Sequence, residues 1–311
     1  MEFKDKVVLV IGASGFIGSH LVQMLAEKGT KHLIATGLHD NKLIRDNFPK
    51  VTFIRWDIRK PFSANKTIDH IKKIDWIFHL GAITDINYCE KYPDIAYEVN
   101  TSSIKNIFEL GEKYSFNNFV YLSTLGVYGN PEYLPIDENH PKRPQNIYTK
   151  SKLECEELVL DYKRKNNGYI NIVRSFNAYG PRQNSSMVIP KIITQALKSN
   201  NIILANINTS RDFIYVTDLV EGLISVAYHN KSDIYNLGSG SEIYINELIN
   251  SISIFLNKEL NVICKTTEKQ FVCRSQANIS KSISELHWKP RVSLKKGLLK
   301  TINYYRKELG E

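Results

Sequence analysis

The chain has 311 residues, of which 42% are hydrophobic and 23% charged, and it carries a formal net charge of +9. This composition is ordinary for a globular enzyme, and the length predicts two lobes or one large α/β domain with a smaller addition. The longest apolar run, Val7–Ile11, is far shorter than the roughly 20 residues of a membrane span, and no signal-peptide layout surrounds it, so we expect a cytoplasmic protein.

Neither the basic residues nor the cysteines form a recognisable binding module. Lysines are dispersed along the chain, which favours a mixed basic surface over a nucleic-acid-binding stripe. The four cysteines follow no zinc-module spacing, so we predict free thiols and no metal site. They are Cys89, Cys155, Cys264 and Cys273.

Patterns of buried strands and helices alternate through the first half of the chain. Val7–Ile11 is a branched apolar run typical of a buried strand, and Ser19–Lys28 has helical periodicity. Alternating strands and helices predict parallel β-α-β units and a doubly wound α/β sheet. The other predicted strands are His32–Thr36, Val51–Trp56, Trp76–Leu80, Asn118–Ser123 and Ile170–Arg174, and the other predicted helices are Ala96–Lys113 and Lys150–Arg164.

After about residue 175 the alternation gives way to longer helical patterns. Helices are predicted in "MVIPKIITQALKS", "EIYINELINSISIFL" and the tail that follows "HWKP", and "RDFIYVTDLVEGLISVAYH" predicts a short strand and then a helix. We therefore predict a cofactor-binding domain over 1–174, with returning segments near 207–240. A smaller, mostly helical lobe is predicted over 175–206 and 241–311.

A glycine-rich turn follows the first strand in "VVLVIGASGFIGSH". Gly12 permits a tight turn, Gly15 lets a pyrophosphate approach the backbone, and Gly18 lets the helix pack against the strand. The free N–H groups and positive end of the helix then face the phosphates. The spacing is Gly-x-x-Gly-x-x-Gly, and its position directly after a buried strand predicts dinucleotide binding.

The end of the second strand bears on the choice between NAD and NADP. A carboxylate at this position accepts the ribose hydroxyls of NAD and repels a 2′-phosphate. Here the position is the neutral Thr36, while His39, Lys42 and Arg45 are nearby cations. This pattern favours NADP, although Asp40 follows closely enough to leave NAD open.

Tyr148 and Lys152 are spaced to lie on one face of a helix. An ammonium beside a phenol favours the phenolate, so we expect the pKa of Tyr148 to fall toward neutrality. The tyrosine could then exchange a proton with a sugar oxygen while hydride moves at the attached carbon. Thr124 directly follows a predicted strand, and its hydroxyl could bond the same oxygen.

Together these motifs resemble the extended short-chain dehydrogenases/reductases that act on nucleotide sugars, the NAD-dependent epimerase/dehydratase family. The resemblance implies a Rossmann-like cofactor domain, a C-terminal substrate lobe, and Thr124, Tyr148 and Lys152 as catalytic residues. The segments that carry it are "GASGFIGSH", "WDIRKP", "FHLGAIT", "YEVNTSSIKNIFEL", "LSTLGVYG", "YTKSK", "RSFNAYGPRQ", "RDFIYVTDLVEG", "YNLGSG" and "SELHWKP".

The resemblance also implies binding residues, position by position. Arg211 and Arg274 correspond to clamps on the substrate pyrophosphate, which suits the planar fork of arginine. The implied substrate-binding set is Thr84, Thr124, Asn177, Val188, Arg211 and Arg274. The implied cofactor-binding set is Gly12, Ser14, Gly15, Phe16, Ile17, Gly18, His39, Asp57, Ile58, Leu80, Gly81, Ala82, Thr84, Asn100, Ser123, Tyr148, Lys152 and Ser175.

Two segments depart from the family pattern. Where the family has a Gly-Asp-Gly turn before its Arg-Asp motif, this chain has "ANINTSRDF", which affects the contacts to the nucleotide base. Where the family often has Arg-Pro, this chain has Arg274-Ser275. The resemblance further implies a homodimer in which the helices Ala96–Lys113 and Lys150–Arg164 of each copy form a four-helix bundle.

The residues after Thr124 limit the reactions that the site could catalyse. Sugar 4,6-dehydratases of this family carry an acid and a base there, whereas this chain has Leu125 and Gly126, so a dehydratase is disfavoured. A 4-epimerase using NAD needs only the catalytic trio, and the small Gly126 would leave the sugar room to turn. A 4-keto reductase using NADPH needs the same trio.

The sequence favours the reductase, acting on a nucleotide-linked 4-keto-6-deoxyhexose, because Thr36 is neutral and the Gly-Asp-Gly turn is missing. The 4-epimerase is the alternative, and a 4-dehydrogenase fits the same residues. A non-catalytic binding protein on this fold is disfavoured because both Tyr148 and Lys152 are present.

Overall fold

The computed structural model describes residues 5–62, 68, 71–265 and 273–310. The chain forms two compact units, each made of several segments. Unit 1 contains Met1–Val127, Lys142–Arg174 and Leu223–Tyr235, and unit 2 contains Tyr128–Pro141, Ser175–Gly222 and Asn236–Glu311. The domain boundaries expected from the sequence stay a prediction.

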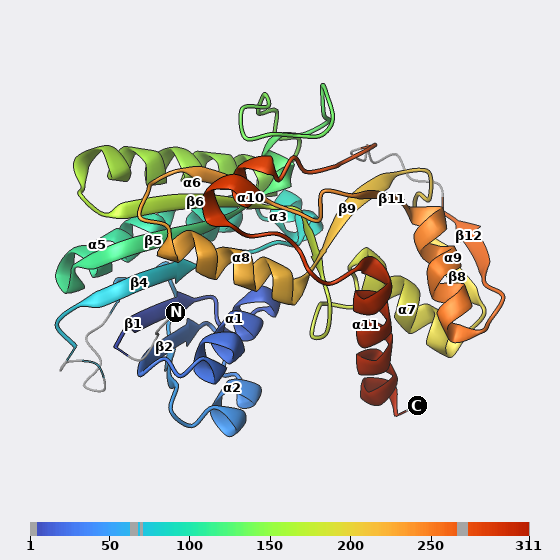
Figure 1. The fold of residues 1–311 in the computed structure, drawn as a ribbon, viewed down its shortest axis with the longest axis horizontal. Coiled ribbons are helices and arrows are strands. Elements are labelled where there is room, and N and C mark those ends of the chain that lie inside the picture. Colours follow the sequence, from blue (N-terminus) through green and yellow to red (C-terminus); the bar gives the residue numbers. More distant parts are fainter. Residues whose placement is uncertain (1–4, 63–67, 69–70, 266–272, 311) are drawn as a thin grey trace. The chain divides into compact units, whose positions relative to one another are not determined.

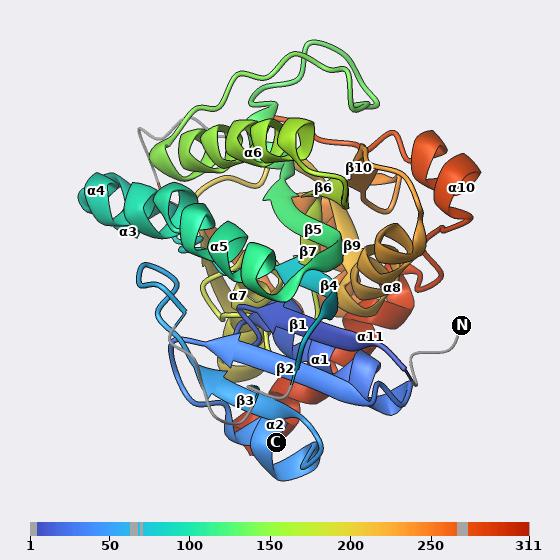
Figure 2. The ribbon, with the colours of Figure 1, turned by 90° about the vertical axis from the view of Figure 1, so that its left-hand side faces the viewer.

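A seven-stranded sheet forms the centre of unit 1, in the order β10-β6-β5-β4-β1-β2-β3 (Figures 1 and 2). The pairs β1–β2, β1–β4, β2–β3 and β4–β5 are all parallel. Strand order reverses beside β1, so the predicted doubly wound sheet is confirmed. The strands are β1 (Val7–Ile11), β2 (His32–Gly37), β3 (Thr52–Arg55), β4 (Ile74–His79), β5 (Phe116–Thr124), β6 (Tyr169–Ser175) and β10 (Ile234–Leu237).

Helices cover both faces of this sheet, with α1 and α2 on one face and α5 and α6 on the other (Figure 2). The strands are buried on both faces, which explains their continuous apolar sequences. The helices are α1 (Phe16–Glu27), α2 (Lys42–Asn47), α3 (Ile86–Lys91), α4 (Pro93–Tyr97), α5 (Ile104–Tyr114) and α6 (Ile147–Lys165), and α8 (Val216–Tyr228) has residues in both units.

The single helix predicted over Ala96–Lys113 is wrong. A π-helical turn, Glu98–Ser102, separates α4 from α5. Side chains inside this turn bond to other segments: Asn100 to the backbone of Ile83, and Thr101 to the carbonyl of Ser151. A π turn re-aims side chains in this way and is common beside functional sites.

Unit 2 surrounds its own hydrophobic core, to which α7, α9, α11 and β9 contribute. It is mostly helical, as predicted, and also contains a three-stranded sheet, β11-β9-β7, and a parallel pair, β12-β8. The missed strands have three or four residues each, too few to show a pattern. The elements are β7 (Asn177–Tyr179), α7 (Val188–Lys198), β8 (Asn201–Leu204), β9 (Ser210–Tyr215), β11 (Glu242–Tyr244), α9 (Ile245–Leu256), β12 (Asn261–Cys264), α10 (Ser280–Leu286) and α11 (Leu294–Leu309).

Among the described residues, no helix has both the length and the apolar character needed to cross a membrane.

Candidate active site

The glycine turn after β1 packs tightly against neighbouring backbone. Gly12 adopts φ +84°, and a Cβ added to it would lie 2.6 Å from the backbone nitrogen of Gly81. A Cβ on Gly37 would collide with the hydroxyl of Ser14. No side chain caps α1 at Gly15, so its first N–H groups remain available for an anion. Close packing of the chain on itself therefore requires glycine at these positions, and the dinucleotide cradle stays a prediction.

The loop after β2 is less basic than its sequence indicated. Arg45 is bonded to Asp40 at 2.5 Å and lies 3.5 Å from a carboxylate oxygen of Asp46, so its charge is already matched. His39 is exposed. A cation that the sequence analysis missed, Arg55 on β3, reaches this loop and donates from Nε to the carbonyl of Leu38 at 3.0 Å. Arg55 lies beside this loop because it pairs with Gly37, the last residue of β2.

The residues predicted to meet the adenine lie after β3. The Asp57 carboxylate accepts from the side chain of Arg59 at 2.6–3.1 Å and from its backbone N–H, which holds the pKa of Asp57 below its usual value. The side chain of Ile58 borders Gly81. This brings Ile58 beside the glycine turn, while the Asp57 carboxylate is already bonded within its own loop.

The segment after β4 is held in place by one buried amide. Asn100 accepts from Ile83 N–H at 2.7 Å, donates to the Ile83 carbonyl at 3.0 Å, and donates to Ser151 Oγ at 3.1 Å. It thereby ties the loop containing Leu80, Gly81 and Ala82 to helix α6. Thr84, at the end of this loop, is exposed.

Helix α6 places the predicted catalytic pair in its first two turns. Asn146 and Thr149 form a capping box, with Thr149 N–H donating to Asn146 Oδ1 at 2.9 Å, so the helix begins just before Tyr148. Tyr148 hydrogen-bonds Thr124, at the carboxyl end of β5. Lys152 follows one turn later on the same face. The structure thus brings the three residues together within unit 1.

The expected lowering of the Tyr148 pKa is wrong for this structure. Burial disfavours the phenolate and raises the pKa of Tyr148 to about 12, and its bond to Thr124 offsets this only in part. Burial also lowers the pKa of Lys152 to about 8, against the opposing effects of Cys155 and Glu156. The attraction between the Lys152 ammonium and the Tyr148 phenolate was expected to lower the Tyr148 pKa. The free-energy cost of burying each charged group outweighs it.

Lys152 lies in a buried aromatic environment. Its side chain is 3% exposed, and its ammonium lies 4.1 Å from the ring centroid of Tyr121. His79, at the end of β4, is also buried, and burial together with the charge of Lys152 lowers the pKa of His79 to about 3. His79 is therefore neutral at physiological pH and adds no positive charge beside Lys152.

A buried ion pair next to the catalytic residues was not predicted. Glu156 and Arg174 are each 1% exposed and are joined by bonds of 2.8–3.3 Å. Ser123, the residue before Thr124, donates its hydroxyl to the same carboxylate. Glu156 lies two turns after Tyr148 on α6. This spacing could have indicated that Glu156 shares the helix face of Tyr148 and Lys152. The pair connects α6, β5 and β6 directly behind the catalytic residues.

Position 126 has no room for a side chain. A Cβ on Gly126 would collide with Thr149, and Leu125 is buried in a 3-10 turn. The glycine therefore does not provide space for a turning sugar, as the sequence analysis expected, because Thr149 already occupies that space. The same packing excludes an acid or a base at position 126.

The residues predicted to bind substrate from unit 2 gather around β7 and β9. Asn177 donates to the Asp212 carbonyl at 3.1 Å, and Arg211 donates to the Ser210 carbonyl at 2.6 Å. Val188 begins α7. Ser175, predicted to contact cofactor, donates its hydroxyl to the carbonyl of the next residue.

The second predicted clamp, Arg274, forms a forked ion pair with Glu242. Arg274 Nε and Nη2 lie 2.9 and 2.6 Å from the two Glu242 oxygens. Glu242 begins β11, which pairs with the strand that carries Arg211. Glu242 had no part in the sequence analysis, because this contact joins residues 32 positions apart in the chain.

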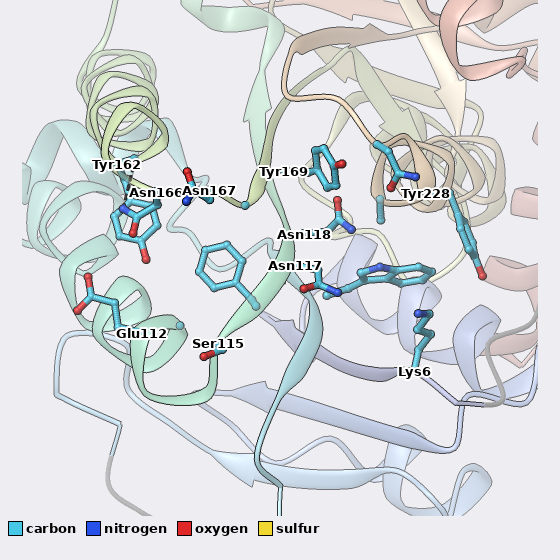
Figure 3. A pocket seen from close by; sticks show the side chains of 16 residues that line it. Lys6, Glu112, Ser115, Asn117, Asn118, Tyr162, Asn166, Asn167, Tyr169 and Tyr228 are labelled. Carbon is cyan, nitrogen blue, oxygen red and sulfur yellow. Dashed lines mark hydrogen bonds between the residues drawn. The ribbon is translucent and has the colours of Figure 1, made fainter.

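A cavity of about 680 Å³ opens at the amino ends of β4, β5 and β6. Figure 3 shows Asn118, Tyr169 and Tyr228 around one part of it, and Tyr162 around another. Thr124 lies at the carboxyl end of β5, the opposite end of the strand from Asn118. We therefore assign this cavity no part in the catalytic site.

Comparison with known proteins agrees with this geometry. The family model of the NAD dependent epimerase/dehydratase family matches residues 8–238, which is most of the chain. The protein belongs to this family and is an NAD(P)-dependent enzyme.

Individual relatives are similar over nearly their whole length. A protein of Methanocaldococcus jannaschii, provisionally named UDP-glucose 4-epimerase, is 33% identical over 305 residues, covering 96% of this chain and 98% of the relative. The UDP-glucose 4-epimerase of Thermotoga maritima, solved with UDP-glucose, matches with a TM-score of 0.89 and 25% identity over 97% of this chain and 99% of its own.

The UDP-glucuronic acid 4-epimerase of Bacillus cereus, solved with UDP-glucuronic acid and NAD, has a TM-score of 0.88 and 25% identity, with coverage of 97% and 99%. Another matching structure holds NADPH. Both NAD and NADPH are thus found among the matching structures.

Proposed function

We propose that the protein is a UDP-hexose 4-epimerase that uses NAD. The observation that carries this is the catalytic arrangement: Tyr148 bonded to Thr124, with Lys152 on the same helix face. Neither an acid nor a base stands at positions 125 and 126, which disfavours a dehydratase and is what a 4-epimerase requires. Relatives named as UDP-sugar 4-epimerases support the same assignment. The 4-keto reductase that the sequence favoured becomes the second candidate.

The residues have distinct parts in this reaction. Tyr148 removes the proton from the sugar 4-hydroxyl and returns it, and Thr124 holds that oxygen by a hydrogen bond. Bound nicotinamide supplies reversible hydride transfer at the same carbon, and its oxidised ring carries a positive charge. Lys152 binds the adjacent ribose. In this proposal the phenolate forms when the bound charges offset the burial that otherwise holds the pKa of Tyr148 at about 12.

NAD is the proposed cofactor because Arg45 is already paired with Asp40 and Asp46. A 2′-phosphate would have to displace these carboxylates. Two observations favour NADP instead. Arg55 reaches the same loop, and Thr36 offers no carboxylate to the ribose. The NADPH-dependent reductase therefore remains the second candidate.

The proposed substrate contacts in unit 2 rest on residues that stand at the family's substrate-binding positions. Arg211 and Arg274 would bind the diphosphate of the nucleotide sugar, and Asn177 would bond the sugar or the phosphate. Thr84 and Val188 complete the proposed set.

The homodimer also stays a prediction. Of the large hydrophobic side chains found exposed among the described residues, none lies in α5 or α6. The outward residues of these helices, such as Glu109 and Glu157, are charged, so a bundle at this surface would rest on polar contacts. Sedimentation velocity would determine the oligomeric state.

The test of the function uses purified protein and a panel of UDP-hexoses without added cofactor, with products separated by chromatography. New 4-epimers, and NAD released on denaturing the protein, are expected. Tyr148→Phe should lower the rate by about 100- to 10,000-fold, because general acid–base catalysis is lost. Tyr162→Phe, which changes a tyrosine further along α6, is the matched control and should retain activity.

A parallel arm adds NADPH and nucleotide-linked 4-keto-6-deoxy sugars. Rapid NADPH oxidation there, without epimer formation in the first arm, would overturn the epimerase in favour of the reductase.

A further inference from the structure

Glu242 occupies the guanidinium fork of Arg274. Both carboxylate oxygens are engaged, one by Nε at 2.9 Å and the other by Nη2 at 2.6 Å. These are the donors with which an arginine binds two oxygens of a phosphate. The guanidinium therefore already holds an anion of the right geometry.

The same carboxylate also lies within the field of the other predicted clamp, Arg211. The charges of Arg274 and Arg211 both lower the pKa of Glu242, and Ser210 donates a hydrogen bond to it. Ser210 N–H also bonds the Cys273 carbonyl at 3.0 Å, which fixes the segment before Arg274 against the start of β9. Two arginines, a hydroxyl and one carboxylate thus form a single cluster in unit 2.

The two members of the pair differ in exposure and in the segment that holds them. The Glu242 side chain is 12% exposed and is held by β11, whereas the Arg274 side chain is 52% exposed and lies on an irregular segment. Arg274 can therefore leave Glu242 without breaking a strand or uncovering the core. An exposed pair is also weak enough to be exchanged for a doubly charged ligand.

We propose that Glu242 is an internal competitor for the substrate diphosphate, and that it sets the affinity of the site by holding Arg274 until the nucleotide sugar binds. This rests on the proposed role of Arg274 as a diphosphate clamp. The carboxylate stands in for one phosphate group, and binding exchanges the Glu242–Arg274 pair for a diphosphate–Arg274 pair. The exchange lowers affinity for substrate and product alike, which limits retention of the nucleotide after the reaction.

The opposite role would have the opposite effect. If Glu242 instead orients Arg274 for the diphosphate, its removal weakens binding. Glu242→Gln distinguishes the two, since it keeps the side-chain size and removes only the charge. Glu259→Gln removes one negative charge from an exposed loop of the same unit and controls for net charge.

The experiment is isothermal titration of the full-length protein with UDP, for the wild type, Glu242→Gln, Arg274→Gln, the double variant and Glu259→Gln. Competition predicts about three- to tenfold tighter binding in Glu242→Gln, the size expected for releasing one exposed pair. Arg274→Gln should weaken binding. In the Arg274→Gln background, Glu242→Gln should have little further effect, because the competing contact is already absent.

Each other outcome has a definite meaning. Weaker binding in Glu242→Gln, with weaker binding in Arg274→Gln, would overturn the competitor role and leave the clamp intact. Unchanged binding in Arg274→Gln would overturn the clamp itself and the inference with it, while the epimerase assay decides the reaction independently. An equal gain in Glu259→Gln would show a net-charge effect and would also overturn the inference.

Discussion

Two glutamate–arginine pairs with the same forked geometry lie in different environments in the two units. Glu156–Arg174 in unit 1 has side-chain exposures of 1% and 2%, whereas in Glu242–Arg274 of unit 2 they are 12% and 52%. The buried pair also holds Ser123 beside the catalytic threonine, and the other lies beside a proposed phosphate clamp. Identical chemistry can thus give a fixed support where water is excluded and an exchangeable contact where it is not.

Removing one partner of the buried pair is the strongest way to test this difference. Arg174→Met should lower the free energy of unfolding by about 3–5 kcal/mol, because the Glu156 carboxylate is left buried without its cation. Urea unfolding, followed by tryptophan fluorescence, would measure the change. The paired variant Glu156→Gln/Arg174→Met should recover most of the loss, since it buries no unmatched charge. A loss below about 1 kcal/mol in Arg174→Met would contradict the classification of this pair as a fixed support.

The paired variant also tests whether the buried carboxylate acts on the catalytic lysine. Glu156 raises the pKa of Lys152, opposing the burial that lowers it to about 8. Without this carboxylate the pKa should fall further, so Lys152 loses its proton at lower pH. If the reaction requires the ammonium, the alkaline limb of the kcat/KM profile should move to lower pH.

The control for this profile is Glu157→Gln, which removes an exposed carboxylate from the next position of α6. Its alkaline limb should stay in place. An unshifted limb in the paired variant, with a lower rate at every pH, would mean that the pair supports the fold without tuning Lys152.

The comparison also shows what the sequence could and could not predict. The glycine turn and the Tyr148–Lys152 spacing depend on neighbours in the chain, so local patterns were enough to find them. One member of the buried pair could be found from the sequence, because Glu156 continues the four-residue spacing of Tyr148 and Lys152. Its partner, Arg174, lies on β6 and could not be found in this way. The Glu242–Arg274 contact depends on where a loop meets a short strand, and no local pattern encodes that.

The errors have a related physical origin. The pKa of Tyr148 was misjudged because desolvation depends on the burial produced by the whole fold. The space beside Gly126 was misjudged because Thr149 fills it from a different element. Local spacing was enough to name candidate catalytic residues, whereas their protonation and the room around them required the packed structure.

The exposed pair is expected to contribute little to stability. Glu242→Gln should change the free energy of unfolding by no more than about 1 kcal/mol, because Arg274 is solvated whether or not it is paired. Urea unfolding under the same conditions as for Arg174→Met would measure it. A loss of several kcal/mol would place this pair with the buried one and would remove the argument that a ligand can exchange it. A small loss, together with tighter UDP binding, would separate the two pairs by function as well as by exposure.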